Sequence, residues 1–462
     1  AFAEADAVIY SRSFNEKFAD LAKSHPTVKV QIPMDPDAEW DPIDPSFLPY
    51  SHLLDMGEAG VREGYAYPAV TDPNRMVEML FTSGTTGSSK CVMLSEKNIV
   101  SVVNNACATV DFSPEDAIVS VLPIHHTYEL AIMLAGLNYG MNIAINDSLK
   151  KVLKNFALFK PTGLVLVPLF VETFYKRILA PAEKQGKLGL LKKMMKVSGA
   201  LLKVGIDLRK KLFAQVTDTF GGHLEMVICG GAALNQDIID FFDAVGITIL
   251  NGYGISECAP LISCNRNEWQ KNGSVGTPII TEKVKIDQPN SDGEGEICVK
   301  GPNVMLGYYK DPEATAAVFD KDGYFHTGDL GKLDDDGWLY ITGRKKNLII
   351  FSNGKNVYPE EIECEISRIR GVAEVVVYAG ESRQNPEKEV IVAEIYPNYE
   401  QLEGDGVCSE REIEDYFNNH VREANTRMAP YKKVGFVKIR KEEFIKNTSR
   451  KITRFNIDKS ID

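Results

Sequence analysis

The chain has 462 residues, of which 44% are hydrophobic and 25% are charged, and its formal net charge at pH 7 is -12. A chain of this length can bury a large core in several folding units, and its acidic balance argues against nucleic acid as a partner. Its eight cysteines include no CxxC pair, which fits neither a zinc site nor a disulfide framework and indicates a reducing, cytoplasmic setting. No apolar run is long enough to cross a membrane.

The first predicted elements are short strands at 7–10 and 28–32 and a helix at 14–22. A further strand, Met76–Phe81, leads into Thr82-Ser83-Gly84-Thr85-Thr86-Gly87-Ser88-Ser89-Lys90. Glycines allow several backbone N–H groups to converge on one anion, hydroxyls add donors and the lysine adds a charge. This composition predicts a phosphate loop, although its spacing is not that of a Walker loop, and a Ser/Gly surface turn stays open as the alternative.

Helices and buried strands then alternate as far as residue 250. We expect helices at 97–109, 149–159 and 237–244 and strands at 117–123, 163–168, 225–228 and 247–250. Such alternation is typical of parallel strands with crossover helices, which defines an α/β fold class. The turns Cys229–Ala233 and Asn251–Glu257 follow two of these strands, and ligands of open α/β sheets gather at the carboxyl ends of strands. We therefore expect a ligand at this edge.

Residues 181–215 are rich in lysine and arginine and poor in acids, with leucines and methionines near helical spacing. The pattern predicts an amphipathic basic helix or helix pair. Two interpretations stay open for it: a solvated helix face packed on the domain, or contact with a membrane surface.

The last part of the chain changes character twice. Residues 273–343 show short alternating strands with tight turns, which predicts a small antiparallel β unit. After a charged junction at Gly343–Asn347, residues 348–462 predict a compact α+β module with helices at 359–369 and 410–424 and strands at 372–378 and 390–396.

Five segments occur in one order, namely Thr82–Lys90, Asn251–Glu257, Tyr324–Asp329, Gly343–Asn347 and Thr448–Ile452. In this order they resemble the adenylate-forming enzymes, the superfamily of acyl-CoA synthetases, luciferases and peptide-synthetase adenylation domains. Leu122–Glu129, the basic insert and Ser352–Glu363 make the chain most similar to bacterial long-chain fatty acid:CoA ligases. The resemblance covers essentially the whole chain.

The resemblance implies a large domain over 1–343, a hinge at 344–347 and a small mobile C-terminal domain over 348–462. Relatives carry a segment before the equivalent of Ala1, so we expect the large domain to be incomplete at its N-terminus. The implied reaction has two halves: a fatty acid carboxylate attacks the α-phosphorus of ATP, releasing pyrophosphate, and the thiol of CoA then displaces AMP. ATP, Mg²⁺ and CoA are the cofactors that this implies.

By resemblance, the glycine-rich loop holds the β- and γ-phosphates, Thr82 and Glu257 hold magnesium, and Asp329 binds the ribose. Gly231, Ala232 and Ala233 would form the adenine slot with the Gly252–Tyr253 turn. The implied ATP-binding set is Thr82, Ser83, Gly84, Thr85, Thr86, Gly87, Lys90, Gly231, Ala232, Ala233, Asn251, Gly252, Tyr253, Gly254, Ser256, Asp329 and Arg344.

Lys451 matches the family's catalytic lysine, which bridges the attacking carboxylate and the α-phosphate. His126 matches a position beside the acyl carboxylate, although the register could shift to His125. Lys346 would be the hinge about which the small domain turns, and the Gly354 loop would serve thioester formation beside the CoA channel.

Three functional interpretations follow. The leading one is a long-chain fatty acid:CoA ligase. The second keeps adenylation but uses another carboxylate or delivers the acyl group to an acyl carrier protein, and the third is an inactive nucleotide-binding remnant. In the leading interpretation the enzyme is cytoplasmic, with peripheral contact to the inner face of a membrane through 181–215 as an open addition.

Overall fold

The structure is a computed structural model, and it describes residues 2–18, 27–35, 37–39, 46–66, 69, 71–82, 90–351, 355–381, 390–446, 452–454 and 457–461. The chain forms two compact units, Ala1–Asp72 and Pro73–Asp462. In the first, β1 (Ala7–Tyr10) and β2 (Val30–Pro33) pair in parallel, with helices η1 (Arg12–Phe14), α1 (Asn15–Phe18) and α3 (Tyr50–Arg62). The predicted junction at 344–347 lies within the second unit, and its role as a domain boundary stays a prediction.

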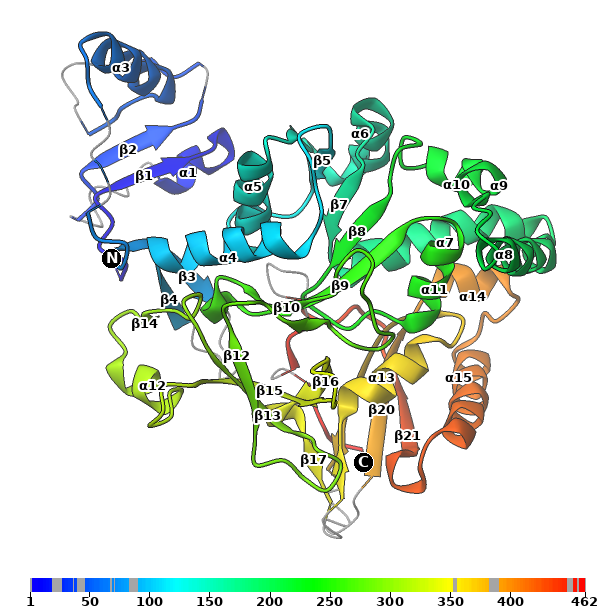
Figure 1. Ribbon diagram of the computed structural model, residues 1–462. Helices are drawn as coiled ribbons and strands as arrows, with labels where there is room; N and C mark the ends of the chain where they lie inside the picture. The colour runs from blue at the N-terminus through cyan, green and yellow to red at the C-terminus, as the bar shows by residue number, and fades with distance from the viewer. Residues whose placement is uncertain are drawn as a thin grey trace. The chain divides into compact units, whose positions relative to one another are not determined.

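A seven-stranded sheet organises the second unit, with the order β11-β10-β9-β8-β7-β5-β6 (Figure 1). Its parallel strands are β5 (Ala117–Ser120), β6 (Asn142–Ile145), β7 (Gly163–Leu166), β8 (Met226–Cys229) and β9 (Thr248–Gly254). Two antiparallel strands, β10 (Leu261–Cys264) and β11 (Thr277–Pro278), extend one edge. The parallel α/β arrangement expected from the alternation of helices and strands is confirmed.

Alternate residues of the central strands face opposite layers of helices. Leu164 and Leu166 belong to a cluster with Phe156 and Phe242, whereas Val165 packs in a different cluster on the other side. This period of two is what buried parallel strands require. The helices of this layered part are α4 (Glu96–Thr109), α5 (Thr127–Tyr139), η2 (Leu149–Lys151), α6 (Val152–Phe159), α7 (Pro168–Lys184), α8 (Leu188–Leu202), α9 (Arg209–Leu212), α10 (Ala214–Asp218) and α11 (Gln236–Ala244).

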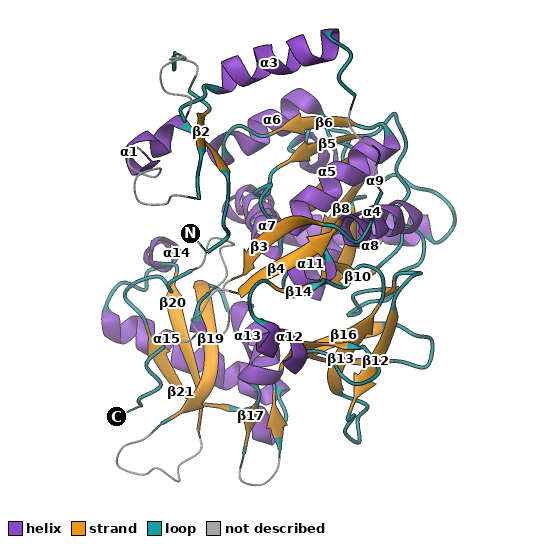
Figure 2. Cartoon of the chain, turned by 90° about the vertical axis from the view of Figure 1, so that its left-hand side faces the viewer, coloured by secondary structure: helices purple, strands orange, loops and turns teal. Residues whose placement is uncertain are grey.

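Two antiparallel sheets complete the part before residue 345 (Figure 2). One contains β3 (Met76–Thr82), β4 (Lys90–Ser95) and β14 (Gly307–Tyr308), and the other contains β12 (Lys283–Asp287), β13 (Gly295–Lys300), β15 (Phe325–Leu333) and β16 (Leu339–Arg344). The short helices here are η3 (Ser256–Cys258) and α12 (Pro312–Ala317). The second sheet is the antiparallel β unit that the alternating pattern of 273–343 predicts.

The C-terminal part has its own apolar core around Val377, Ile395 and Phe417. Strands β19 (Val372–Gly380), β20 (Val390–Pro397) and β21 (Val434–Ile439) form its sheet, and β17 (Ile349–Ile350) pairs with β18 (Asn356–Val357). Its helices are η4 (Lys345–Asn347), α13 (Pro359–Ser367), α14 (Tyr399–Gly404), α15 (Glu410–Ala424), η5 (Asn425–Arg427) and η6 (Pro430–Lys432). The predicted α+β character of this part is present.

The basic segment 181–215 contains the end of α7 together with α8, α9 and the start of α10. Leu191, Met194 and Met195 of α8 pack against the core, as the amphipathic pattern predicts. Over the described part of the chain, no helix combines the length and apolar composition needed to cross a membrane.

Candidate active site

A cavity of about 2680 Å³ lies at the carboxyl ends of the parallel strands in the second unit. Its walls also include β15, β16, η4, α13 and, near the C-terminus, residues 452–454, 457 and 459. The predicted site residues that the structure describes all line it: Thr82, Lys90, His126, Gly231, Ala232, Ala233, Asn251, Gly252, Tyr253, Gly254, Ser256, Glu257, Asp329, Arg344 and Lys346. Ser83, Gly84, Thr85, Thr86, Gly87, Gly354 and Lys451 lie outside the described residues. The fold thus brings segments separated by more than two hundred residues to one cavity.

The turn after β8 and the last residues of β9 form one wall of the cavity. The sequence predicted a turn from Asn251, but β9 continues to Gly254 because these residues pair with β10. Gly231 has φ +88°, a conformation that side chains with a Cβ adopt with strain. A Cβ on Gly254 would lie 2.0 Å from the carbonyl oxygen of Pro260. Glycine is therefore needed at 254 for the close packing of β9 against the following turn, whatever the turn binds.

Asp329 is buried and both of its carboxylate oxygens have partners. Its Oδ2 accepts from the hydroxyl of Tyr253 at 2.8 Å, and its Oδ1 lies 3.0 Å from Nε of Arg344. The ion pair follows from the register of β15 and β16, which places Asp329 opposite Arg344. A ribose at Asp329 would share these oxygens with Tyr253 and Arg344.

Glu257 and Lys90 meet the same tyrosine. The hydroxyl of Tyr308 donates to Oε1 of Glu257 at 3.0 Å, and Nζ of Lys90 lies 4.5 Å from the centre of the Tyr308 ring. Thr82 lies opposite Lys90 in the β3–β4 hairpin, and its hydroxyl donates to the Lys90 carbonyl at 3.4 Å. Hydroxyl and carboxylate oxygens are the ligand types that Mg²⁺ prefers, so the donor set of Thr82 and Glu257 fits that ion.

His126 lines the cavity and stands directly before α5, whereas His125 is absent from the lining. Glu129, in the first turn of α5, holds this end of the helix against the end of β5 through two hydrogen bonds. The hydroxyl of Ser120 and the backbone N–H of Leu122 both hydrogen-bond the Glu129 carboxyl, which is 1% exposed. Burial raises the pKa of Glu129 and the two hydrogen bonds lower it. Burial is the larger effect, so the pKa is about 7.

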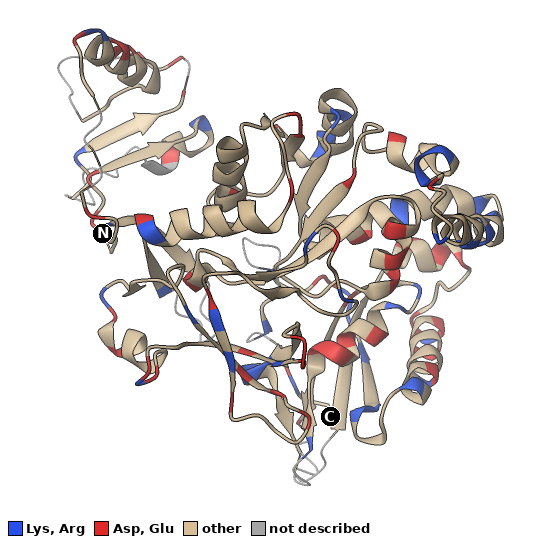
Figure 3. Ribbon diagram, in the orientation of Figure 1, with Lys and Arg blue, Asp and Glu red and all other residues tan. Residues whose placement is uncertain are grey.

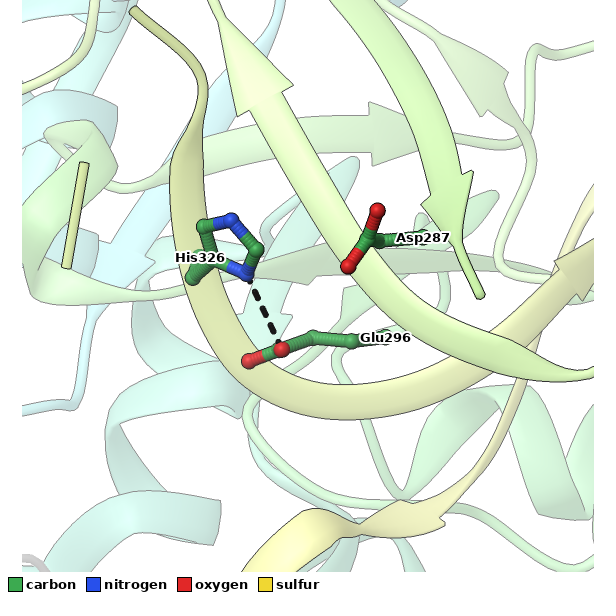
Figure 4. Close-up of side chains that lie close together, drawn as sticks. All are labelled: Asp287, Glu296 and His326. Atoms are coloured by element: carbon green, nitrogen blue, oxygen red, sulfur yellow. Dashed lines mark hydrogen bonds and ion pairs between the residues drawn. The ribbon is translucent and has the colours of Figure 1, made fainter. Parts of the chain in front are cut away.

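Asp287, Glu296 and His326 form one group close enough to hold a metal ion among the described residues (Figure 4). Oε2 of Glu296, however, lies 3.0 Å from Nδ1 of His326 and 2.8 Å from the ammonium of Lys345. Desolvation opposes ionisation of Glu296, but the hydrogen bonds from Lys345 and His326 outweigh it and lower the pKa of this carboxyl. An ammonium therefore already occupies the place of a cation.

Glu296 instead connects two parts of the cavity wall. Its Oε1 accepts from the backbone N–H of Gly328 at 3.1 Å, beside Asp329, while its Oε2 binds Lys345 in η4. The sequence alone indicates no role for Glu296 or for Tyr308. Neither belongs to a motif, and both acquire their position through pairing between distant strands.

Lys346 lies in η4, where the cavity meets the C-terminal part. Desolvation, followed by the charges of Arg344 and Arg454, lowers the pKa of Lys346 to about 8. Arg344 precedes the junction and Arg454 follows it, while Asp329 and Glu360 act against their effect on the pKa of Lys346.

Comparison with known proteins decides the family. A sequence model described as "AMP-binding enzyme" matches residues 1–309, more than half of the chain. The chain belongs to the AMP-binding enzyme family. Curated relatives include the human long-chain-fatty-acid–CoA ligase 1, with 33% identity over 368 residues that cover 76% of this chain and 51% of the relative. Fatty acyl-CoA synthetase B of Dictyostelium discoideum is 31% identical, over 89% of this chain and 61% of the relative.

This AMP-binding family member spans about half the length of the human relative. Among solved structures, ATP-bound MatB from Rhodopseudomonas palustris is 26% identical with a TM-score of 0.71, covering 98% of this chain and 78% of that chain. An ATP-bound chimera named RpMatB-BxBclM B1 is also 26% identical and has a TM-score of 0.73, with coverage of 98% and 79%. The α/β fold of this family member is therefore the fold of adenylate-forming enzymes.

Proposed function

We propose that this chain is an ATP-dependent acid:thiol ligase, which activates a long-chain fatty acid as an acyl-adenylate and transfers the acyl group to CoA. The observation that carries the proposal is the convergence on one cavity of the described motif residues. The names of the curated relatives, which are long-chain fatty acid ligases, support the choice of substrate.

Binding of ATP divides among three walls of the cavity. The turn around Gly231 and the end of β9 around Gly252 would enclose adenine, and Asp329 with Arg344 would bind the ribose. Thr82, Ser83, Gly84, Thr85, Thr86, Gly87 and Lys90 would hold the phosphates with backbone N–H groups, hydroxyls and one ammonium. Tyr308 binds Glu257 through its hydroxyl and has the ammonium of Lys90 over its ring, so it places these two charged groups relative to each other.

The adenylation step depends on position and charge more than on covalent help from the protein. Thr82 and Glu257 would hold Mg²⁺, which neutralises charge on the phosphates when bound. Lys451 would bring its ammonium between the acyl carboxylate and the α-phosphate, and His126 would stand beside that carboxylate. The products of this half are acyl-adenylate and pyrophosphate.

Thioester formation would use a second arrangement of the C-terminal part. Rotation at Lys346 would withdraw Lys451 and bring the Gly354 loop to the CoA thiol, which displaces AMP. The hydrogen bond that Tyr358 donates to Glu294 would have to break in this rotation, because Tyr358 follows Lys346 in the chain and Glu294 precedes it.

The partners of the proposal are fatty acid, ATP and CoA in a cytoplasmic setting. In this proposal, helix α8 and the turn after it also contact the surface of an anionic membrane. A long-chain acid would reach the enzyme from that surface. Figure 3 shows the concentration of lysine and arginine on α8 and α9. Delivery to an acyl carrier protein stays the alternative to CoA.

Carboxylate-dependent exchange of labelled pyrophosphate into ATP tests the proposal, with palmitate, acetate and benzoate compared and Lys451→Ala as the control. We expect exchange with palmitate that the Lys451→Ala variant loses, and acyl-CoA when CoA is added. Exchange without acyl-CoA formation would favour a carrier-protein acceptor. A folded chain that binds ATP but exchanges with no carboxylate would leave only the nucleotide-binding remnant.

A further inference from the structure

The three residues that follow Lys451 in the chain are each held in place. Ile452 pairs with Lys446 in an antiparallel bridge and packs against the cluster of Tyr378 and Phe444. The backbone N–H and the hydroxyl of Thr453 both donate to the carbonyl of Ile445, each at 2.8 Å. The chain is therefore fixed immediately after the proposed catalytic lysine.

Arg454 makes the strongest of these attachments. Its Nη2 lies 2.6 Å from both carboxylate oxygens of Glu363 on α13, and its Nη1 donates to the carbonyl of Val377 at 3.0 Å. Glu363 also accepts from the backbone N–H of Val377 at 2.7 Å. Charge-assisted hydrogen bonds of this kind are about twice as strong as neutral ones, so the pair ties the C-terminal segment to α13 and β19 together.

The two partners differ in their relation to the cavity. Arg454 lines it, whereas Glu363 is absent from the lining although Glu360, Glu361 and Ile362 belong to it. Glu363 reaches the cavity wall through two contacts, Arg454 and the N–H of Val377, and Glu363→Gln keeps an oxygen that can accept from Val377.

We propose that the Arg454–Glu363 pair positions Lys451 for the adenylation half-reaction. This inference rests on the proposed function, and it assigns no contact with substrate to either residue. A lysine side chain is long and has several rotatable bonds, so the place of its ammonium depends on how firmly its backbone is held. A shift of about 1 Å in a reacting group can cost about a hundredfold in rate.

The test separates the two half-reactions in the full chain. Arg454→Gln and Glu363→Gln should each lower palmitate-dependent pyrophosphate exchange about a hundredfold. Each should leave acyl-CoA formation from supplied palmitoyl-adenylate and CoA within about threefold of the unmodified chain, because Lys451 serves only the first half. The double variant should be no slower than the slower single variant, since the pair acts as a unit.

Lys441→Gln is the control. Lys441 binds Glu410 at 2.5 Å in the same part of the chain, the two side chains are 77% and 79% exposed, and neither residue lines the cavity. We expect it to leave both half-reactions within about threefold, as surface changes usually do.

Three results would overturn the inference. Equal loss of both half-reactions in the Arg454 and Glu363 variants would mean that the pair only stabilises the C-terminal part. A loss for Arg454→Gln with none for Glu363→Gln would mean that Arg454 acts on the substrate itself. Exchange unchanged in both would mean that the pair has no part in adenylation. Absence of exchange in the unmodified chain contradicts the proposed function instead, so the two failures are distinct.

Discussion

The carboxyl of Glu129 links the stability of the fold to pH at the place that positions His126. Its pKa is about 7 in the folded chain against an ordinary value of 4.5, so the folded state binds this proton more tightly than the unfolded state. The contribution of Glu129 to the free energy of unfolding is therefore most favourable at low pH. It falls as the pH rises from 4.5 towards 7, and it is constant above pH 7. We expect the stability advantage of Glu129→Gln over the unmodified chain to increase by roughly 2 to 3 kcal/mol in free energy of unfolding between pH 5 and pH 8.

Urea unfolding of both chains at pH 5, 6, 7 and 8 measures this difference. Glu115→Gln, the same substitution at an exposed position, provides the control. A constant difference for Glu129→Gln across the range would show that Glu129 is ionised throughout.

At the scale of residues, the sequence located those that belong to motifs. Asp329 and Glu257 were predicted by position in a motif and both line the cavity. Tyr308 was not, because its place between Lys90 and Glu257 depends on β14 pairing with β4, more than two hundred residues earlier in the chain. Local pattern carries no information on such a pairing.

At the scale of elements, the approach of β11 to β10 requires a glycine. Gly276 has φ +86°, and a Cβ there would lie 1.9 Å from the carbonyl carbon of Cys264. Gly273 has a similar φ of +76°, but its Cβ would meet nothing nearer than 3.9 Å. We expect Gly273→Ala to cost about 1 kcal/mol from backbone strain, and Gly276→Ala to cost at least about 3 kcal/mol because the backbone of β10 must also move.

Unfolding midpoints of the two variants in urea give the comparison, with each glycine serving as control for the other. Equal losses would mean that the edge of the sheet moves to accept the methyl group, and that strain alone decides both positions.

Boundaries of elements were predicted well where caps are local. Helix α11 begins one residue before the predicted start, next to the Asn235 cap. The strand predicted over 117–123 instead ends at Ser120, because the N–H of Leu122 turns to the carboxyl of Glu129. The order of strands in the large sheet could not be predicted, since it depends on which crossovers pack together and not on any one segment.

At the scale of the whole molecule, charge is distributed unevenly along the chain. Residues 184–212 contain nine basic residues and one acid, a net +8, against -12 for the full sequence. Val204, Ile206 and Leu190 are exposed among them, at 70%, 47% and 56%. The basic residues and these exposed aliphatic side chains do not pack in the core, because other residues form the buried side of α8.

Cations beside exposed aliphatic side chains match an anionic lipid surface, which takes up both. We therefore expect the chain to sediment with vesicles of phosphatidylglycerol and phosphatidylcholine but not with phosphatidylcholine alone. Less should sediment at 500 mM salt than at 50 mM, because salt screens the charges.

Lys192→Glu/Lys193→Glu should weaken this binding at least about thirtyfold, since each basic residue near such a surface contributes about 1 kcal/mol. Lys150→Glu/Lys154→Glu, on η2 and α6, changes the net charge equally and should have little effect. If the two double variants bind the vesicles equally, net charge alone explains the attraction. If the chain binds an oligonucleotide and not the vesicles, the basic segment 184–212 recognises a different polyanion.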